Sequence, residues 1–280
     1  MNNNVAESTI QLLDASELDN VDRVKDLLAQ GADLNAQDEA GLTALMVAAD
    51  YGREKVAEHL LSLPTIDTEV REDELGCTAL LWAAGQGQLR LVKMLLQHGA
   101  DPGAVSNSGV TALMAAAKNG REEVADYLLS LPSTDMEAKC EYGATALLYA
   151  ARGGHLHIFQ LLLHSGANIE AVDHEGNNVL TCAAMGVGDI MAAEEEEREI
   201  EGVRQVIQYL VEEAGFPVAD RVLEYVAGDV DTLAFCLASR WGPSSLQTLA
   251  RRAAWSVPRA AWADTVLWRI RILRNFVNEE

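Results

Sequence analysis

Disulfides and membrane spans are the first features that this sequence lacks. Its four cysteines lie far apart and form no C-x-x-C pair, so in a reducing compartment we expect free thiols and not disulfides or zinc ligands. No apolar run reaches the roughly 18–20 residues that a membrane span requires. Residues 1–7 lack the basic segment and the apolar run of a secretory signal. We therefore expect a cytoplasmic protein, with the nucleus as the alternative location.

Signatures of catalysis are also missing. The sequence contains no P-loop, no G-x-S-x-G and no H-E-x-x-H motif. His155 and His157 are two residues apart, which on a helix directs them to different sides and prevents shared metal binding. The glycines at 186–188 follow a predicted helix and not a strand, so they make a poor nucleotide loop. We expect no enzyme activity, no catalytic residues, no metal site and no cofactor.

Positive charge is scarce outside the end of the chain. The formal net charge is −22 at pH 7. Residues 240–280 contain seven arginines against three acidic residues, a net of +4, so the first 239 residues carry −26. A body this acidic repels phosphate backbones, and we expect no nucleic acid to bind through the main surface. A basic protein partner, or the basic tail folded back onto the acidic body, fits this asymmetry.

A repeat dominates the remaining sequence. Four segments begin with glycine, any residue and then Thr-Ala-Leu, and a fifth keeps the glycine and the leucine. Their first residues are Gly41, Gly76, Gly109, Gly143 and Gly176, at intervals of 35, 33, 34 and 33 residues. Each segment continues into a pair of alanines, and in the first four a leucine pair begins 11 residues after the second alanine. A period this regular indicates one structural unit repeated along the chain.

One copy of the repeat shows how the unit folds. Residues 78–84 predict a short helix whose small alanines let a neighbour approach closely, and Gly-Gln-Gly at 85–87 ends it. Residues 89–96 have apolar side chains at helical spacing, which predicts a second, antiparallel helix. Gly99 is expected to end that helix in the left-handed conformation, and residues 101–108 form a turn. Two such short helices bury their apolar faces only when copies stack.

These motifs resemble the ankyrin repeat. The elements G-x-T-A-L, A-A-x-x-G, V-x-x-L-L and G-A-D-x-x-A are present, with alanine where that family usually has proline after the threonine. The resemblance covers residues 12 to about 186. It implies an all-α solenoid of helix-turn-helix units with hairpin-like loops, with about six to seven repeats including degenerate terminal ones.

Three regions are expected within this architecture. Residues 1–40 form an N-terminal capping repeat, because residues 12–36 keep the second helix but have a polar first part. Residues 41–219 are the ankyrin repeats, the last interrupted by an acidic insertion at about 187–202. The insertion contains Glu194–Glu197, which repel one another, so it should protrude as a loop or a helix extension. It either holds a basic partner or is simply a solvated insertion.

The third region, residues 220–280, is expected to contain a degenerate repeat and a basic, helical C-terminal cap rich in tryptophan and arginine. A docking module is the alternative, because tryptophan and arginine dominate binding hot spots. Residues 243–254 also resemble the start of a suppressor-of-cytokine-signalling box, a module that follows ankyrin repeats in certain ubiquitin-ligase receptors and docks elongin. Ala250 stands where that module has cysteine, and no Leu-Pro-x-Pro cullin signature follows.

The ankyrin resemblance also implies where a partner binds. In ankyrin stacks the partner usually lies across the hairpin tips and the inner helices. The corresponding tip residues are Glu39, Leu42, Glu74, Leu75, Val110 and Tyr142. The corresponding inner-helix residues are Asp50, Tyr51, Trp82, Gln86, Lys118, Asn119 and Arg152.

Four of the tip residues are apolar or aromatic where a free-standing turn would prefer polar side chains, namely Leu42, Leu75, Val110 and Tyr142. An apolar ridge on a surface that need not be apolar suggests a partner. Trp82 and Tyr149 occupy equivalent inner-helix positions, either as anchors for a partner or as packing between neighbouring helices.

The function expected from these features is a non-catalytic scaffold or adaptor. It would act as a monomer and bind a protein partner of unknown identity on its concave ankyrin face. A preordered surface of this kind loses little entropy on binding. Two alternatives stay open: an acidic inhibitor or regulator of a basic protein, and a ubiquitin-ligase substrate receptor acting through residues 243–277.

Overall fold

The computed structural model describes most of the chain as helices joined by turns. The described residues are 3–193, 197–219, Val222, Tyr225, Val226, Asp229 and Cys236. Within them the named elements are all helices, which confirms the predicted all-α repeat fold. The chain divides into two units, residues 1–150 with 157–176, and residues 151–156 with 177–280.

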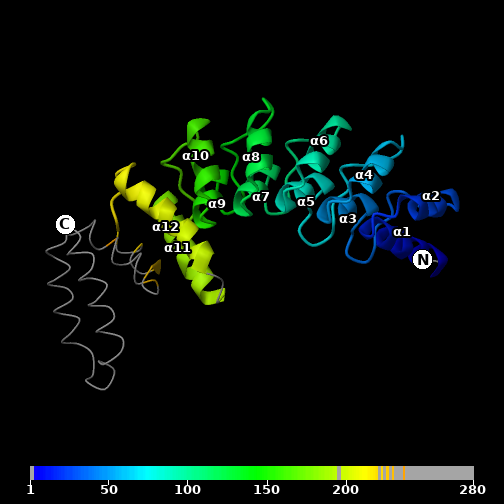
Figure 1. Cartoon of the computed structure of the whole chain (residues 1–280), viewed down its shortest axis with the longest axis horizontal. Helices are drawn as coiled ribbons and strands as arrows, with labels where there is room; N and C mark the ends of the chain where they lie inside the picture. The colour runs from blue at the N-terminus through cyan, green and yellow to red at the C-terminus, as the bar shows by residue number, and fades with distance from the viewer. Residues whose placement is uncertain are drawn as a thin grey trace, which may run out of the picture. The chain divides into compact units, whose positions relative to one another are not determined.

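The helices of the first unit follow one another as successive pairs in chain order (Figure 1). From the N-terminus their bounds are α1 (Asn3–Glu17), α2 (Val21–Ala29), α3 (Ala44–Asp50), α4 (Glu54–Leu61), α5 (Ala79–Gln86), α6 (Leu89–Gln97), α7 (Ala112–Lys118), α8 (Glu122–Leu129), α9 (Ala146–Arg152) and α10 (Leu156–His164). The second unit contains α11 (Val179–Ala193) and α12 (Glu197–Glu212).

The helices of the first unit form two layers. The first helices of the pairs, α1, α3, α5 and α7, contact one another in that order, and α2, α4, α6 and α8 do the same in the second layer. Small side chains permit this approach, because Ala48 and Ala49 of α3 and Ala83 and Ala84 of α5 are each 0% exposed. The alanine pairs of the sequence therefore mark the inner contact between repeats.

Threonine and glycine define the helix ends. Thr43 precedes α3, and its Oγ1 accepts a hydrogen bond from the Met46 N–H at 3.3 Å. Thr111 does the same for α7, accepting from the Met114 N–H at 3.2 Å. Such N-terminal caps satisfy a backbone donor that the helix itself leaves unpaired. Gly99 follows α6 with φ of +92°, which is the left-handed conformation predicted for it.

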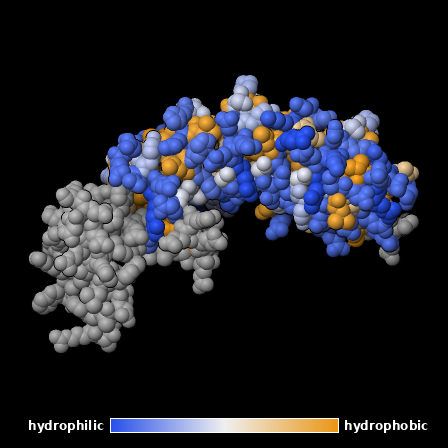
Figure 2. Space-filling model, viewed as in Figure 1, coloured by the Kyte–Doolittle hydropathy of each residue, from blue (hydrophilic) through white to orange (hydrophobic). Residues whose placement is uncertain are grey.

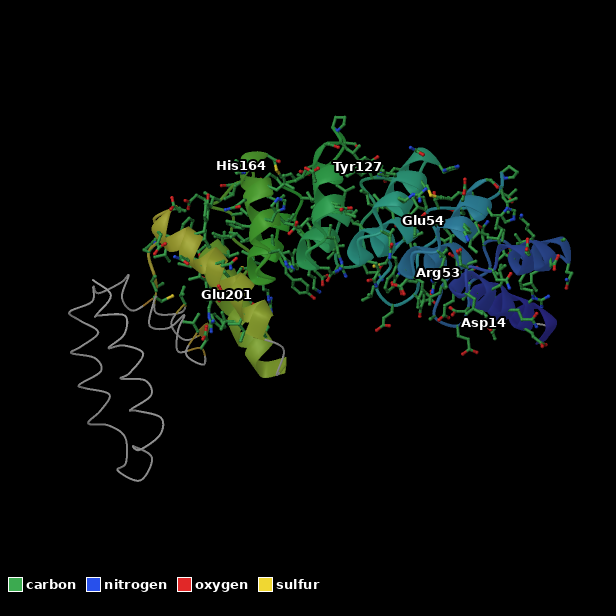
Figure 3. All side chains as sticks on the ribbon, viewed as in Figure 1. Asp14, Arg53, Glu54, Tyr127, His164 and Glu201 are labelled. Atoms are coloured by element: carbon green, nitrogen blue, oxygen red, sulfur yellow. The ribbon has the colours of Figure 1, made fainter. Side chains whose placement is uncertain are left out.

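Side chains also join the second-layer helices. Arg90 of α6 lies 2.7 Å from the Glu54 carboxylate of α4, and Lys93 Nζ lies 4.8 Å from the centroid of the Tyr127 ring of α8. Figure 3 shows Glu54 and Tyr127 on these helices. Exposed ion pairs add roughly 1 kcal/mol or less, so the burial of apolar side chains is what holds the stack together.

Backbone hydrogen bonds connect the hairpin tips of the first unit. Each tip donates one N–H to a carbonyl oxygen of the preceding tip. The four bonds are Asp73 N to Ala40 O at 3.1 Å, Asn107 N to Leu75 O at 2.7 Å, Glu141 N to Ser108 O at 2.8 Å and His174 N to Tyr142 O at 2.9 Å. The repeats therefore follow one another along the stack, and their tips are held at fixed positions relative to one another.

The second unit contains the interrupted repeat. Its helices α11 and α12 have 15 and 16 residues and pack against each other, whereas α7 and α8 have 7 and 8. The described part of the insertion thus takes the form of a helix extension, one of the two expected alternatives. Glu194–Glu196 and most of residues 220–280, including the expected basic cap and the segment at 243–277, lie outside the described residues.

The glycines of the insertion have a packing role that the sequence did not indicate. Gly186–Gly188 lie inside α11, although the sequence placed them after a helix. A Cβ added at Gly186 would overlap the carbonyl oxygen of Arg152. A Cβ added at Gly202 of α12 would lie 2.6 Å from the carbonyl oxygen of Gly154. Glycine at these positions lets the helix backbones approach residues 151–156 closely.

A buried carboxylate closes the hairpin tip before α5. Glu72 is 5% exposed, and its carboxylate accepts hydrogen bonds from the N–H groups of Glu74, Leu75 and Cys77 at 2.7, 2.8 and 3.0 Å. Burial of an ionised group is tolerated only when such bonds are made. The carboxylate therefore fixes the conformation of this tip.

Replacing this carboxylate should destabilise the stack. Glu72→Ala leaves three backbone donors without their acceptor, so we expect the free energy of unfolding to fall by about 3 kcal/mol. Urea unfolding followed by circular dichroism measures the change. Glu74→Ala is the matched control, because it removes the same charge from the same turn but from an exposed side chain, and we expect a change within about 0.5 kcal/mol. Equal losses in the two variants would contradict the role assigned to Glu72.

Candidate protein-binding surface

The candidate residues taken from the sequence lie at the hairpin tips and at the ends of the inner helices. Leu75, Tyr142 and Tyr51 are 53%, 62% and 49% exposed, whereas Leu42 and Val110 are half-buried. The apolar ridge predicted along four tips is therefore prominent at two of them. The face shown in Figure 2 is mainly hydrophilic, with small separate hydrophobic patches, so fully exposed apolar side chains are few.

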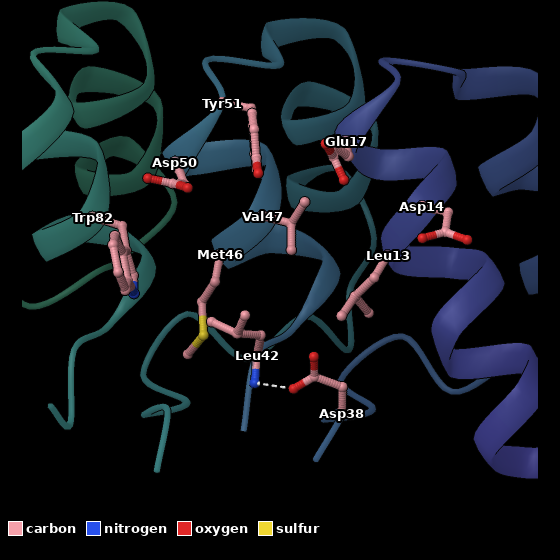
Figure 4. Close-up of a pocket in the computed structure, with 10 residues that line it drawn as sticks. All are labelled: Leu13, Asp14, Glu17, Asp38, Leu42, Met46, Val47, Asp50, Tyr51 and Trp82. Carbon is pink, nitrogen blue, oxygen red and sulfur yellow. Dashed lines mark hydrogen bonds between the residues drawn. The ribbon is translucent and has the colours of Figure 1, made fainter. Parts of the chain in front are cut away.

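A first groove lies between α1, α3 and α5, and we call it the acidic groove (Figure 4). Its cavity volume is about 270 Å³. Its apolar and aromatic lining residues are Leu13, Leu42, Met46, Val47, Tyr51 and Trp82. Its remaining lining residues are the carboxylates Asp14, Glu17, Asp38 and Asp50. No lysine or arginine is among the described residues that line it.

The four carboxylates of the acidic groove differ in whether they already accept hydrogen bonds from other groups of the chain. Asp38 accepts hydrogen bonds from the N–H groups of Ala40 and Leu42 at 2.9 and 2.8 Å, so it shapes its own turn (Figure 4). Asp50 accepts one from Gln86 Nε2 at 2.7 Å. These bonds fix the two carboxylates at the edge of the groove without neutralising their charge.

The other two carboxylates, Asp14 and Glu17, are exposed on α1. Neither makes a side-chain hydrogen bond or an ion pair with any residue that the structure describes. Sequence reasoning missed both residues, because the capping region lacks the repeat motif from which the other candidates were placed. Their i, i+3 spacing, which puts two side chains on one helix face, was the available signal.

A second groove adjoins the first, and we call it the central groove. Its cavity volume is about 250 Å³. It is lined by the predicted residues Leu75, Trp82, Gln86, Val110, Lys118 and Asn119, and also by Tyr149. Lys118 is the single charged side chain among its described lining residues, and no carboxylate lines it. The central groove is thus more apolar than the acidic groove and carries the opposite sign of charge.

Trp82 is the one residue that the linings of the two grooves share. Its side chain is half-buried, and its indole Nε1 is buried without a hydrogen-bond partner among the described residues. The two interpretations of Trp82, partner anchor and packing residue, are therefore compatible: one part of the ring packs inside the stack and another part faces the grooves. Tyr149, at the equivalent position, lies with its hydroxyl 3.5 Å from Cys140 Sγ.

Four predicted residues line neither groove. Glu39, Glu74 and Tyr142 lie at the tips of the first unit, outside both linings. The Tyr142 hydroxyl bonds to the Glu141 carboxylate, which raises the pKa of Tyr142. Arg152 pairs with Asp189 at 2.7 Å within the second unit. The structure therefore brings together nine of the thirteen predicted residues around two grooves.

Neither a metal site nor a membrane span is found among the described residues. In the described part of the chain, no cluster of three or more histidine, cysteine, aspartate or glutamate side chains is arranged to hold a metal ion. None of the described helices combines the length and the apolar character of a membrane span. Cys77 lines the central groove, and its burial together with the nearby Glu72 carboxylate raises its pKa to about 11. Its thiol is therefore protonated near neutral pH and is a weak nucleophile.

Comparison with known proteins agrees with the geometry. The family described as ankyrin repeats (3 copies) matches residues 12–106, 66–140, 87–173 and 113–194. Neurogenic locus notch homolog protein 1 is 31% identical over 171 residues in Cricetulus griseus and 30% identical over 171 residues in Homo sapiens, covering 61% of this chain. Neurogenic locus notch homolog protein 2 of Homo sapiens is 34% identical over 162 residues, or 58% of this chain. The matched segment spans 5% of the length of each of these relatives.

The raised pKa of Cys77 predicts a distinct pH dependence of alkylation. Because only the thiolate reacts, the rate with iodoacetamide should rise about tenfold per pH unit between about pH 7 and pH 10. At pH 8 it should be about 100-fold below that of a thiol with the ordinary value of 9.0. Peptide mass spectrometry measures the rate at Cys77, and the chain unfolded in urea serves as the control. A rate in the folded chain that levels off near pH 9 would refute the shift.

Proposed function

The chain belongs to the ankyrin-repeat family, and on that premise we propose that it is a non-catalytic scaffold or adaptor whose partner protein binds across the hairpin tips and inner helices of the first unit. Ankyrin repeats are protein–protein interaction modules. The observation that supports binding at this surface is the pair of adjoining grooves that meet at Trp82. We expect the chain to act as a monomer in the cytoplasm or the nucleus.

The geometry of the tips supports this proposal. Leu75 and Tyr142 are more than half exposed, yet the carbonyl oxygen of each accepts a backbone hydrogen bond from the next tip. Their positions are therefore set before any partner arrives. Binding to a preordered surface avoids the entropy loss of ordering loops, so exposed apolar groups on it contribute more of their burial to affinity.

A second candidate function is an acidic regulator that covers a basic surface of its partner. The unpaired Asp14 and Glu17 beside the bonded Asp50 favour it. The third candidate, a ubiquitin-ligase substrate receptor acting through residues 243–277, concerns a segment outside the described residues. Co-purification of elongin with the intact chain would select it.

The tip residues provide the test of the leading proposal. The double variant Leu75→Glu, Tyr142→Glu should reduce the capture of partner proteins by the intact chain at least about tenfold, because it puts charge into apolar contacts. Quantitative mass spectrometry of the captured proteins measures this. Leu18→Glu is the matched control, since Leu18 is 75% exposed but lines neither groove. Partners retained equally by the double variant and the control would refute binding through these tips.

The regulator hypothesis makes a different prediction about salt. If the partner is held mainly through opposite charge, its affinity should fall at least about tenfold between about 50 mM and 500 mM NaCl, because exposed charges are screened. Titration of the captured partner at several salt concentrations measures the slope. An affinity that stays constant with salt favours the apolar tips as the main contact and argues against the regulator.

A further inference from the structure

The acidic groove and the central groove differ in charge although they adjoin. Four carboxylates and no basic side chain line the acidic groove, whereas one lysine and no carboxylate line the central groove. A partner segment lying across both therefore meets two different environments in succession. Only a segment with matching chemistry at both places avoids burying a charge against one of the same sign.

The acidic groove combines two features that suit one kind of side chain. Its lining includes the buried apolar side chains Leu13, Met46 and Val47, and its rim carries the unpaired carboxylates Asp14 and Glu17. Lysine and arginine have long aliphatic stems that pack on apolar surface while the charged head stays among polar groups. Aspartate or glutamate would be repelled here, and a purely apolar side chain would leave the carboxylates without a partner.

A cation of the chain itself, Arg53, lies near this groove. Arg53 lies with its guanidinium 5.8 Å from the centroid of the Tyr51 ring, and its Nε is buried. Arg53 does not line the groove, and no described residue forms an ion pair with Asp14 or Glu17. The two α1 carboxylates therefore remain open to a cation of a partner protein, as far as the described residues are concerned.

The spacing of the grooves limits how far apart the matching residues of a partner can be. The acidic groove is centred on α3 and the central groove on α5 and α7, and neighbouring helices of a packed layer lie about 8–10 Å apart. An extended chain advances about 3.3–3.6 Å per residue. The centre of the central groove therefore lies about one and a half helix spacings, or about 12–15 Å, from α3. This distance corresponds to about four residues of an extended segment, a separation that also places both side chains on the same face of that segment.

We propose that the two grooves bind a single extended protein segment, which places a lysine or arginine in the acidic groove and an apolar side chain in the central groove, about four residues apart. Trp82 lies between the two positions and contacts the segment on both sides. This inference rests on the proposed function and specifies its partner class. Charge complementarity decides the first position, and the apolar lining decides the second.

Selection from a random peptide library displayed on phage, with the intact immobilised chain as target, tests the proposal. Enriched peptides should share a basic residue and an apolar residue about four positions apart. Three variants serve as further targets. Asp14→Lys with Glu17→Lys reverses the charge at the two α1 positions of the acidic groove, and Leu75→Glu alters the central groove. Glu58→Lys with Glu123→Lys changes the net charge equally on exposed second-layer positions outside both grooves.

The expected result separates the two grooves. Peptides from the intact chain should bind the Asp14→Lys, Glu17→Lys variant at least about tenfold more weakly and the Glu58→Lys, Glu123→Lys variant nearly as well. Replacing the basic residue of a selected peptide by glutamate should restore binding to the first variant. Leu75→Glu should remove the apolar preference and keep the basic one. Circular dichroism of each variant verifies that it is folded.

Other results would overturn the inference in distinguishable ways. Peptides that need Leu75 but show no basic preference would refute the two-groove inference and leave the proposed function intact. Equal weakening by both lysine pairs would show that total charge, and not the acidic groove, attracts the basic residue, and would also refute it. No enrichment, or enrichment insensitive to every groove variant, would contradict the proposed function as well.

Discussion

The structure depends on one constraint: each of its short helices is too small to be stable without neighbours. A helix of seven residues such as α3 or α7 makes too few internal hydrogen bonds to offset the loss of chain entropy. The alanine pairs allow stabilising contacts with neighbouring helices. Ala48 and Ala49 of α3, like Ala116 and Ala117 of α7, are 0% exposed between the helices of adjacent repeats. Burial between repeats therefore adds to the burial between the two helices of each repeat, and the stack is stable only as a whole.

This constraint also shapes the surface. Once adjacent repeats are packed, their hairpin tips stand close enough for the Asn107 N–H to reach the Leu75 carbonyl at 2.7 Å. The exposed side chains at the tips, unlike the buried Glu72 carboxylate, are then not needed to hold the turn, and their identity is open to selection for binding. Leu75 and Tyr142 illustrate this freedom, because both are exposed while the backbone beneath them is bonded. The scaffold and the recognition surface are thus built from different atoms of the same residues.

The parts of the fold that the sequence predicted are those that recur along the chain. The alanine pairs recur in every copy, and the left-handed glycine after the second helix recurs in alternate copies as Gly31, Gly99 and Gly166, so the copies support one another's interpretation. Features present in one copy could not be predicted in this way. Glu72 stands where neighbouring copies have Asp38 and Ser106, and its three backbone bonds follow from local geometry alone.

The same reasoning explains why the binding residues predicted from the sequence did not include Asp14 and Glu17. Asp14 and Glu17 belong to α1, which keeps none of the repeat motif, so their place in the acidic groove depends on how a helix of 15 residues packs on α3. Lys118 was found, because it occupies a recurring inner-helix end. The net charge of −22 could not locate either groove. Charges are screened over roughly 8 Å at physiological salt, so a cation on a partner responds to the few carboxylates around it and hardly to the total. Selectivity on this scaffold therefore resides in the order of local charges along the inner helices, which tertiary packing creates and composition does not reveal.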